Sequence, residues 1–284
     1  MLLKTSGPFL ACSLFTGAIL LSAAPAWAQK YAVYSADTQP SSGADGSSNY
    51  GLLVLGAGIA PHHMGTNKYT SIPFLAGSYR SGNRRYTSRG LGVDINLNAE
   101  QRFSYGPIIH WRSKVKHSHS KGRAKQLSNI KGTPELGGFI GYQLRGDSHS
   151  QGRINLQLAG MHDMGDAHKG FLLTGRVDYA VLRSHPLNID ARLETSWASS
   201  DFQQTYFGVN TSESRRSGLK RYRPGSGFRD VTAGLTLSHQ ITPSFGVLTQ
   251  ASLTRLVGPT ADSPIVGEAS KTTALMGVAA TWNF

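Results

Sequence analysis

Apolar and polar residues alternate along much of this chain, most clearly in the segment 188–198. Successive side chains of a β-strand point to opposite faces, so such alternation predicts a strand with one apolar and one charged face. A helix would scatter the charges around its circumference. The same alternation recurs in 171–182 and 231–238. In 188–198 the first face carries Ile189, Ala191, Leu193, Thr195 and Trp197, and the second carries Asp190, Arg192, Glu194 and Ser196.

The pattern predicts about twelve strands, many of them as long as the roughly 9–11 residues that a tilted membrane strand requires. No helix of useful length is expected between them. This excludes α/β folds and leaves a sandwich, a soluble barrel or a membrane barrel. The expected strands are 50–60, 69–80, 84–97, 101–113, 134–146, 153–163, 169–182, 188–198, 200–208, 228–240, 244–256 and 272–284.

Two features favour an all-β fold of the outer-membrane type, a closed antiparallel transmembrane β-barrel. Charges such as Asp94 and Arg176 stand in mid-strand, where the dry core of a sandwich could not tolerate them. The last strand ends in Trp282 and Phe284, which resemble the insertion signal of bacterial outer-membrane barrels. Because unpaired backbone groups are costly in hydrocarbon, the last strand must meet the first, near residues 50–60.

Composition supports the β assignment and adds a targeting segment. The chain has 284 residues, 33 of them glycine, and only 16% are charged, which argues against coiled coils and helical bundles. Residues 1–28 predict a signal peptide cleaved after Ala28, in preference to a transmembrane anchor or a lipoprotein modified at Cys12. Residues 29–49 predict a flexible periplasmic lead-in, and 50–284 the barrel domain. The expected location is the cell outer membrane.

With both ends of the barrel in the periplasm, counting strands back from Phe284 predicts outward connections at 257–271 and 209–227 and a tight inner turn at 241–243. The same count puts the long connection 114–133 on the periplasmic side, against the usual trend of long outer loops. Either the strand count is off by one in this region, or the protein has a true periplasmic loop.

The net charge of +13 includes a run without any acid between 114 and 125. The functional interpretation is a loop that contacts anions, either lipopolysaccharide phosphates on the outside or an acidic partner on the inside. Export and the absence of interleaved aromatic residues argue against nucleic acid. The alternative is a merely solvated loop. The cations are Lys114, Lys116, Lys121, Arg123 and Lys125.

Charges of both signs occur on neighbouring expected strands and should face the barrel interior. They would form a cross-strand ladder that narrows the lumen. The alternative is a selectivity ring in an open pore, although a mixture of signs favours pairing over a filter of one sign. The candidate residues are Arg176, Asp178, Asp190, Arg192 and Glu194.

Metal, cofactor and catalytic sites are not expected. The pairs His62-His63 and His117/His119 lack the further acidic or cysteine ligands that a metal site needs. His162 beside Asp163 suggests a barrel-borne hydrolase, but no nucleophile motif accompanies the pair.

Five segments, 206–209, 217–219, 222–231, 255–258 and 261–266, read YFGV, SGL, YRPGSGFRDV, RLVG and ADSPIV. They resemble the MipA/OmpV family of outer-membrane proteins, and a looser likeness covers residues 50–284. The basic loop departs from the family pattern.

The resemblance implies a non-catalytic outer-membrane barrel without cofactors. The name-giving member of the family scaffolds a lytic transglycosylase and a peptidoglycan synthase, so the expected partners are a lytic transglycosylase and a penicillin-binding protein, besides outer-membrane lipid and lipopolysaccharide. A periplasmic loop at 114–133 would suit such a scaffold. Other members are porin-like proteins or antigens, so a small-solute channel is the alternative.

Overall fold

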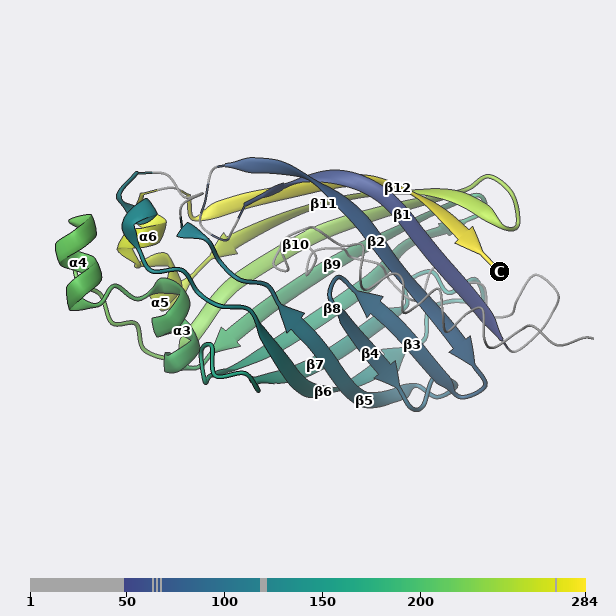
Figure 1. Cartoon of the computed structure of the whole chain (residues 1–284). Helices are drawn as coiled ribbons and strands as arrows, with labels where there is room; N and C mark the ends of the chain where they lie inside the picture. Colours follow the sequence, from purple (N-terminus) through teal and green to yellow (C-terminus); the bar gives the residue numbers. More distant parts are fainter. Residues whose placement is uncertain (1–48, 63, 65, 67, 118–121, 269) are drawn as a thin grey trace, which may run out of the picture.

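The structure, a computed structural model, describes residues 49–284 apart from 63, 65, 67, 118–121 and 269. In this part of the chain, antiparallel strands form one closed barrel (Figure 1). The expected signal peptide and lead-in lie outside the described residues. The strands are β1 (Tyr50–Pro61), β2 (Tyr69–Ser81), β3 (Arg84–Arg89), β4 (Gly92–Asn96), β5 (Phe103–Arg112), β6 (Thr133–Leu144), β7 (Ile154–Asp163), β8 (Phe171–Ser184), β9 (Leu187–Ala198), β10 (Gly227–Gln240), β11 (Phe245–Leu256) and β12 (Thr272–Asn283).

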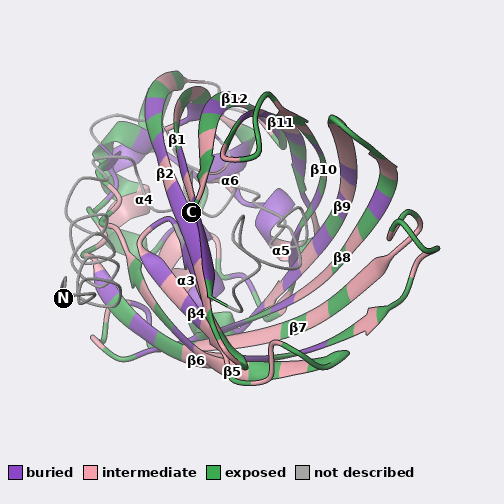
Figure 2. Ribbon diagram, turned by 90° about the vertical axis from the view of Figure 1, so that its right-hand side faces the viewer, coloured by how far each residue is buried: buried purple, intermediate pink, exposed green. Residues whose placement is uncertain are grey.

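The two faces of the wall differ as the alternation predicted, and Figure 2 shows buried and exposed residues alternating along the strands. On β9, Leu193 faces outward and is 54% exposed, whereas its neighbour Glu194 faces inward and is 4% exposed. Leu235 and Leu253 on β10 and β11 are likewise exposed. A continuous apolar outer surface of this extent is unfavourable in water and is stabilised by lipid.

The barrel closes between β12 and β1. Leu52 pairs with Asn283 and Ile59 with Met276 at the two ends of this seam. Beyond the strand, the Gly51 amide donates to the Phe284 carbonyl at 2.7 Å, and the Phe284 amide donates to the Gly51 carbonyl at 3.0 Å. The Phe284 ring occupies the space in which a side chain at Gly51 would lie. The predicted closure between the last and the first strand is therefore confirmed.

The number of strands is correct, but two of the predicted elements are wrong. Residues 84–97 form a hairpin, β3 and β4, because the chain reverses at Gly90, whose φ of +61° is favourable for glycine. Residues 200–208 form a helix, α3 (Ser200–Phe207), instead of a strand. The Ser199 hydroxyl accepts a hydrogen bond from the Phe202 amide, so this serine caps the helix. The two errors cancel in the count.

Further helical turns, each of four to seven residues, lie in the connections between the strands. They are α4 (Thr211–Ser217), α5 (Gly258–Ala261), α6 (Pro264–Gly267) and the 3-10 turn η3 (Gly122–Gln126). No helix among the described residues is both long and apolar enough to cross a membrane.

The three longest connections between strands all lie at one end of the barrel. The end that holds Tyr50 and Phe284, here the short-turn end, carries 82–83, 97–102, 145–153, 185–186 and 241–244. The opposite end, here the loop end, carries the long connections 113–132, 199–226 and 257–271 and the shorter ones 62–68, 90–91 and 164–170. The long connection at 114–133 therefore lies with the other long loops. The prediction placed this loop on the wrong side because residues 200–208, counted as a strand, form helix α3. Counting back from Phe284, that extra strand reversed the direction of every strand before it.

Candidate functional site

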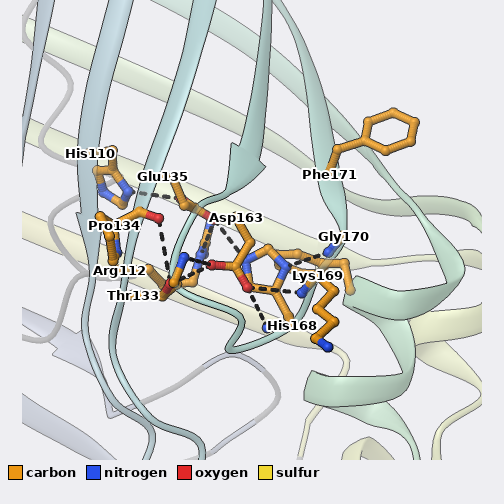
Figure 3. Close-up of polar contacts among 12 residues, drawn as sticks. His110, Arg112, Thr133, Pro134, Glu135, Asp163, His168, Lys169, Gly170 and Phe171 are labelled. Atoms are coloured by element: carbon orange, nitrogen blue, oxygen red, sulfur yellow. Dashed lines mark hydrogen bonds and ion pairs between the residues drawn. The ribbon is translucent and has the colours of Figure 1, made fainter.

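A buried carboxylate, Glu135 on β6, is the centre of a polar cluster inside the loop end of the barrel (Figure 3). Register pairs His110 of β5 with Glu135, and Glu135 with Asp163 of β7, so three inward positions on adjacent strands lie side by side. The Arg112 guanidinium binds Glu135 through both carboxylate oxygens, at 2.7 and 2.9 Å. The His110 ring nitrogen Nδ1 lies 3.0 Å from Glu135 Oε2. These contacts satisfy a charge that burial alone would make costly.

The connection between β7 and β8 folds back onto this carboxylate. The Gly170 amide donates to Nδ1 of His168 at 3.2 Å, so the ring proton sits on Nε2, which lies 3.0 Å from Glu135 Oε1. Asp163 accepts hydrogen bonds from the amides of Gly165, His168 and Lys169 and from the Thr133 hydroxyl. Glu135 and Asp163 together therefore hold the 164–170 loop inside the mouth of the barrel.

Helix α3 covers the cluster with aromatic rings. The guanidinium carbon of Arg112 lies 5.1 Å from the centre of the Phe202 ring and 5.8 Å from the centre of the Tyr206 ring. The guanidinium carbon of Arg229 lies 5.4 Å from the centre of the Phe202 ring. His168 packs edge-on against Phe202 at 4.9 Å. Such contacts stabilise cations that have left water.

A cavity of about 60 Å³ remains beside Arg112, Tyr206 and Arg229. The Tyr206 hydroxyl has no hydrogen-bond partner in the described part of the chain. Burial raises the pKa of Tyr206 to about 12, so the phenol stays protonated at neutral pH.

The cluster does not have the arrangement of a hydrolase. His162 is exposed on the outer face of β7, whereas Asp163 is buried on the inner face, so the two cannot act as a pair. Among the described side chains, neither His110 nor His168 is hydrogen-bonded to a hydroxyl group that could serve as a nucleophile. The described residues also contain no group of three or more potential metal ligands. What the described contacts do show is that the cluster joins β5 and β6 to the 164–170 loop, through Glu135 with Arg112 and His168 and through Asp163 with the loop amides.

Three long loops, 113–132, 199–226 and 257–271, pack together over this end, and we call them the loop cap (Figure 1). They share a small apolar core of Ala124, Leu127, Val209, Leu219 and Ile265. At its edge the Arg123 guanidinium binds Glu268 at 2.6 Å and the Gly218 carbonyl at 3.0 Å, which ties all three loops together.

The five residues of the candidate ladder all lie on β8 and β9. Arg176 pairs with Glu194 at 2.9 Å and also donates to Gln157 at 2.8 Å. Arg192 pairs with Asp178. Asp190 instead binds Arg183, which the sequence analysis did not include.

The candidate anion-contacting residues lie in the loop cap. Lys114, Lys116 and Lys125 are exposed, whereas Arg123 is engaged by Glu268. Lys121 lies outside the described residues. Of the candidate insertion signal, Trp282 lies 5.0 Å from Phe284 between ring centres and stacks on Phe245 at 6.4 Å, at the short-turn end.

The pairing of Arg123 with Glu268 should make the loop cap sensitive to acid. Hydrogen bonds from Arg123 hold the pKa of Glu268 below its ordinary value of 4.5. Because the pKa is lower in the folded chain, the pair stabilises the cap fully at neutral pH, and this contribution is lost as the pH falls below about 4.5 and through the folded pKa. Limited proteolysis of the cap should accelerate in that range. The variant Glu268→Gln should be cleaved at a rate that no longer changes there, and an unchanged acid response would contradict the role of this pair.

The closed barrel, with its apolar outer face and polar, ion-paired interior, defines a membrane-spanning β-barrel of the outer-membrane type. More particularly, the chain belongs to the MipA family: the family model described as MltA-interacting protein MipA matches residues 53–284. The resemblance drawn from the sequence motifs is thus confirmed. No curated protein matches the chain.

Among solved structures, the chain is similar to an outer membrane channel from Pseudomonas putida F1, with 10% identity and a TM-score of 0.46, over 89% of this chain and 100% of that one. It is also similar to a loop-deletion mutant of OmpT, an outer membrane protein of Vibrio cholerae. That match has 6% identity and a TM-score of 0.39, over 83% of this chain and 98% of the other.

Proposed function

We propose that this protein is a non-catalytic scaffold in the outer membrane, which it reaches through a cleaved signal peptide at residues 1–28. Its partners are a lytic transglycosylase and a penicillin-binding protein, which the scaffold holds together for murein remodelling. The observation that carries this proposal is membership of a family whose description names an interaction with MltA. The absence of a hydrogen-bonded nucleophile beside His110 or His168 in the described residues supports a role in binding rather than in catalysis.

The proposal puts the short-turn end in the periplasm, where murein enzymes act. Outer-membrane barrels have short periplasmic turns and long outer loops, and the position of the three longest connections at the opposite end supports this orientation. The loop at 114–133 therefore loses the periplasmic docking role that the sequence suggested for it. The best remaining surface is the connection 145–153, the longest at the short-turn end, which exposes Arg145, Ser148 and His149.

Under this proposal, the ion-paired residues of β8 and β9 narrow the lumen of the barrel. Each of Arg176, Arg183 and Arg192 has a carboxylate partner on the inner face. Paired charges of both signs leave little net field for selecting a permeating ion. Together with the loop cap over one end, they favour a scaffold over an open channel.

The test is recovery of the enzymes from solubilised cell envelopes on the purified full-length protein. The unmodified chain should retain a lytic transglycosylase, identified by mass spectrometry, together with a penicillin-binding protein. Arg145→Glu combined with His149→Glu should reduce recovery at least about tenfold, because two new carboxylates on the assigned surface must lose water when a partner covers it. The matched control is Lys220→Glu combined with Arg223→Glu in the loop cap, which should retain both enzymes. Recovery of neither enzyme by the unmodified chain would contradict the scaffold, and equal loss in both variants would contradict the assigned surface.

A further inference from the structure

The basic residues of the loop cap extend well beyond the run recognised in the sequence. The 113–132 loop contains six Lys and Arg and no acid, and the 199–226 loop contains five Lys and Arg against two acids. The two segments meet where η3 lies beside α4: the Arg216 guanidinium donates to the Gln126 carbonyl at 2.6 Å and to the Ser128 hydroxyl at 3.1 Å. Cations that are about ninety residues apart in the sequence are thereby brought onto one surface.

The acidic residues next to this surface are already engaged by other groups. Glu213 completes the capping box of α4 and accepts a hydrogen bond from the Ser128 amide at 3.2 Å. Glu268 binds Arg123. Among the described residues, Lys125, Arg215 and Lys220 are exposed and have no acidic partner within ion-pair distance. The surface therefore keeps a positive potential that is available to an external anion.

We propose that this composite surface binds the phosphate groups of lipopolysaccharide. We call it the basic surface and define it by Lys114, Lys125, Lys131, Arg215 and Lys220. The inference rests on the proposed function, in which the loop end faces outward from the outer membrane. Lipopolysaccharide is the phosphorylated glycolipid of that side.

The arrangement of the cations fits a ligand that lies in the membrane surface and rises from it. Lys114 follows the end of β5 by two residues and Lys131 precedes β6 by two, so both lie at the rim, where the apolar wall ends. Arg215 lies on α4, Lys125 lies on η3, which packs against α4, and Lys220 follows α4 by three residues. Figure 1 shows α4 projecting beyond the ends of the strands. A phosphorylated headgroup could contact the two lysines at the rim, and its outer phosphates could contact the cations farther out. Charge-assisted hydrogen bonds from Lys and Arg to phosphate are among the stronger polar contacts.

The loops are held in a fixed arrangement, which favours binding of a multivalent anion. The shared apolar core and the hydrogen bonds of Arg123 and Arg216 order the three segments before any ligand arrives. Little entropy is then lost when several cations engage one ligand. None of Lys125, Arg215 and Lys220 belongs to these structural contacts, so all three can be changed without breaking them.

The test measures binding of purified lipopolysaccharide, and of the same lipopolysaccharide after enzymatic dephosphorylation, to the full-length protein in detergent micelles. The triple variant Lys125→Glu, Arg215→Glu and Lys220→Glu should bind the phosphorylated form at least about tenfold more weakly, because each cation near an anionic surface contributes substantially. The control reverses three exposed arginines at the short-turn end, Arg84, Arg102 and Arg145. It changes the net charge equally and should bind normally. Dephosphorylation should weaken binding to the unmodified protein in the same way.

The outcomes separate this inference from the proposed function. Equal weakening in both triple variants would show a net-charge effect and overturn the inference, as would unchanged binding after dephosphorylation. If glutamate prevents folding, which electrophoretic mobility with and without heating reveals, the same three positions are changed to serine and the expected weakening is smaller but in the same direction. Recovery of the murein enzymes is measured on the unmodified protein and on the loop-cap triple variant, whose docking surface is intact, so a failure to bind lipopolysaccharide leaves the scaffold proposal standing.

Discussion

Replacing Glu135 by leucine is expected to destabilise the barrel by about 3–5 kcal/mol, the usual cost of removing one partner from a buried ion pair. The substitution leaves Arg112 charged and buried, and it removes the acceptor that His110 and His168 share. Unfolding by urea in lipid vesicles, followed by tryptophan fluorescence, should show a lower midpoint with a similar slope.

Two controls isolate the buried charge. Glu268→Leu breaks a far more exposed pair with Arg123 and should change the midpoint only slightly. Combining Glu135→Leu with Arg112→Met removes both charges and should recover much of the lost stability, since buried ion pairs can often be replaced by apolar residues. Equal midpoints for Glu135→Leu and Glu268→Leu would show that the cluster does not hold the mouth of the barrel together.

Replacing Phe284 by alanine is expected to remove most of the protein from the outer-membrane fraction. The ring lies over Gly51 at the closing seam and contacts Trp282, so its loss weakens the junction of the first and last strands and the candidate insertion signal together. Cell fractionation and heat-dependent electrophoretic mobility measure the assembled amount.

The matched control for this prediction is Phe245→Ala. Phe245 is an exposed aromatic residue on β11 at the same end, and its ring stacks on Trp282. Its loss removes a similar apolar area without affecting the contact with Gly51, and the protein should still assemble. Phe284→Tyr should also assemble. If the Phe284→Ala and Phe245→Ala variants assemble equally well, Phe284 is not part of the insertion signal.

Alternation along the chain was sufficient to predict the barrel because each residue that faces lipid must be apolar, which imposes a period of two on most strands. The alternation predicted the wrong element in two segments whose composition resembles that of a strand. Residues 200–207 contain Phe202 and Tyr206 four positions apart, after a capping serine at 199, and this helical spacing was overlooked. Gly90 was a turn signal within a stretch that otherwise suited one long strand.

The contacts of the site depend on register, which a single sequence does not reveal. His110, Arg112 and Glu135 could have been recognised as inward polar positions, but their convergence follows from the pairing of β5 with β6. Arg183 was missed for a related reason. The pairing of β8 with β9 shifts between Ala180 and Leu182, and the extra residue turns Arg183 toward Asp190.

The seam between β1 and β12 sets the order in which this molecule can be completed. Every other pair of neighbouring strands is consecutive in the sequence, whereas the seam joins residues about 230 positions apart, such as Leu52 and Asn283. Hairpins can therefore form as the chain is supplied, but until the final strand arrives the nascent sheet has two bare edges that invite pairing with other chains. Pairing of these two edges is therefore the last step in completing this barrel.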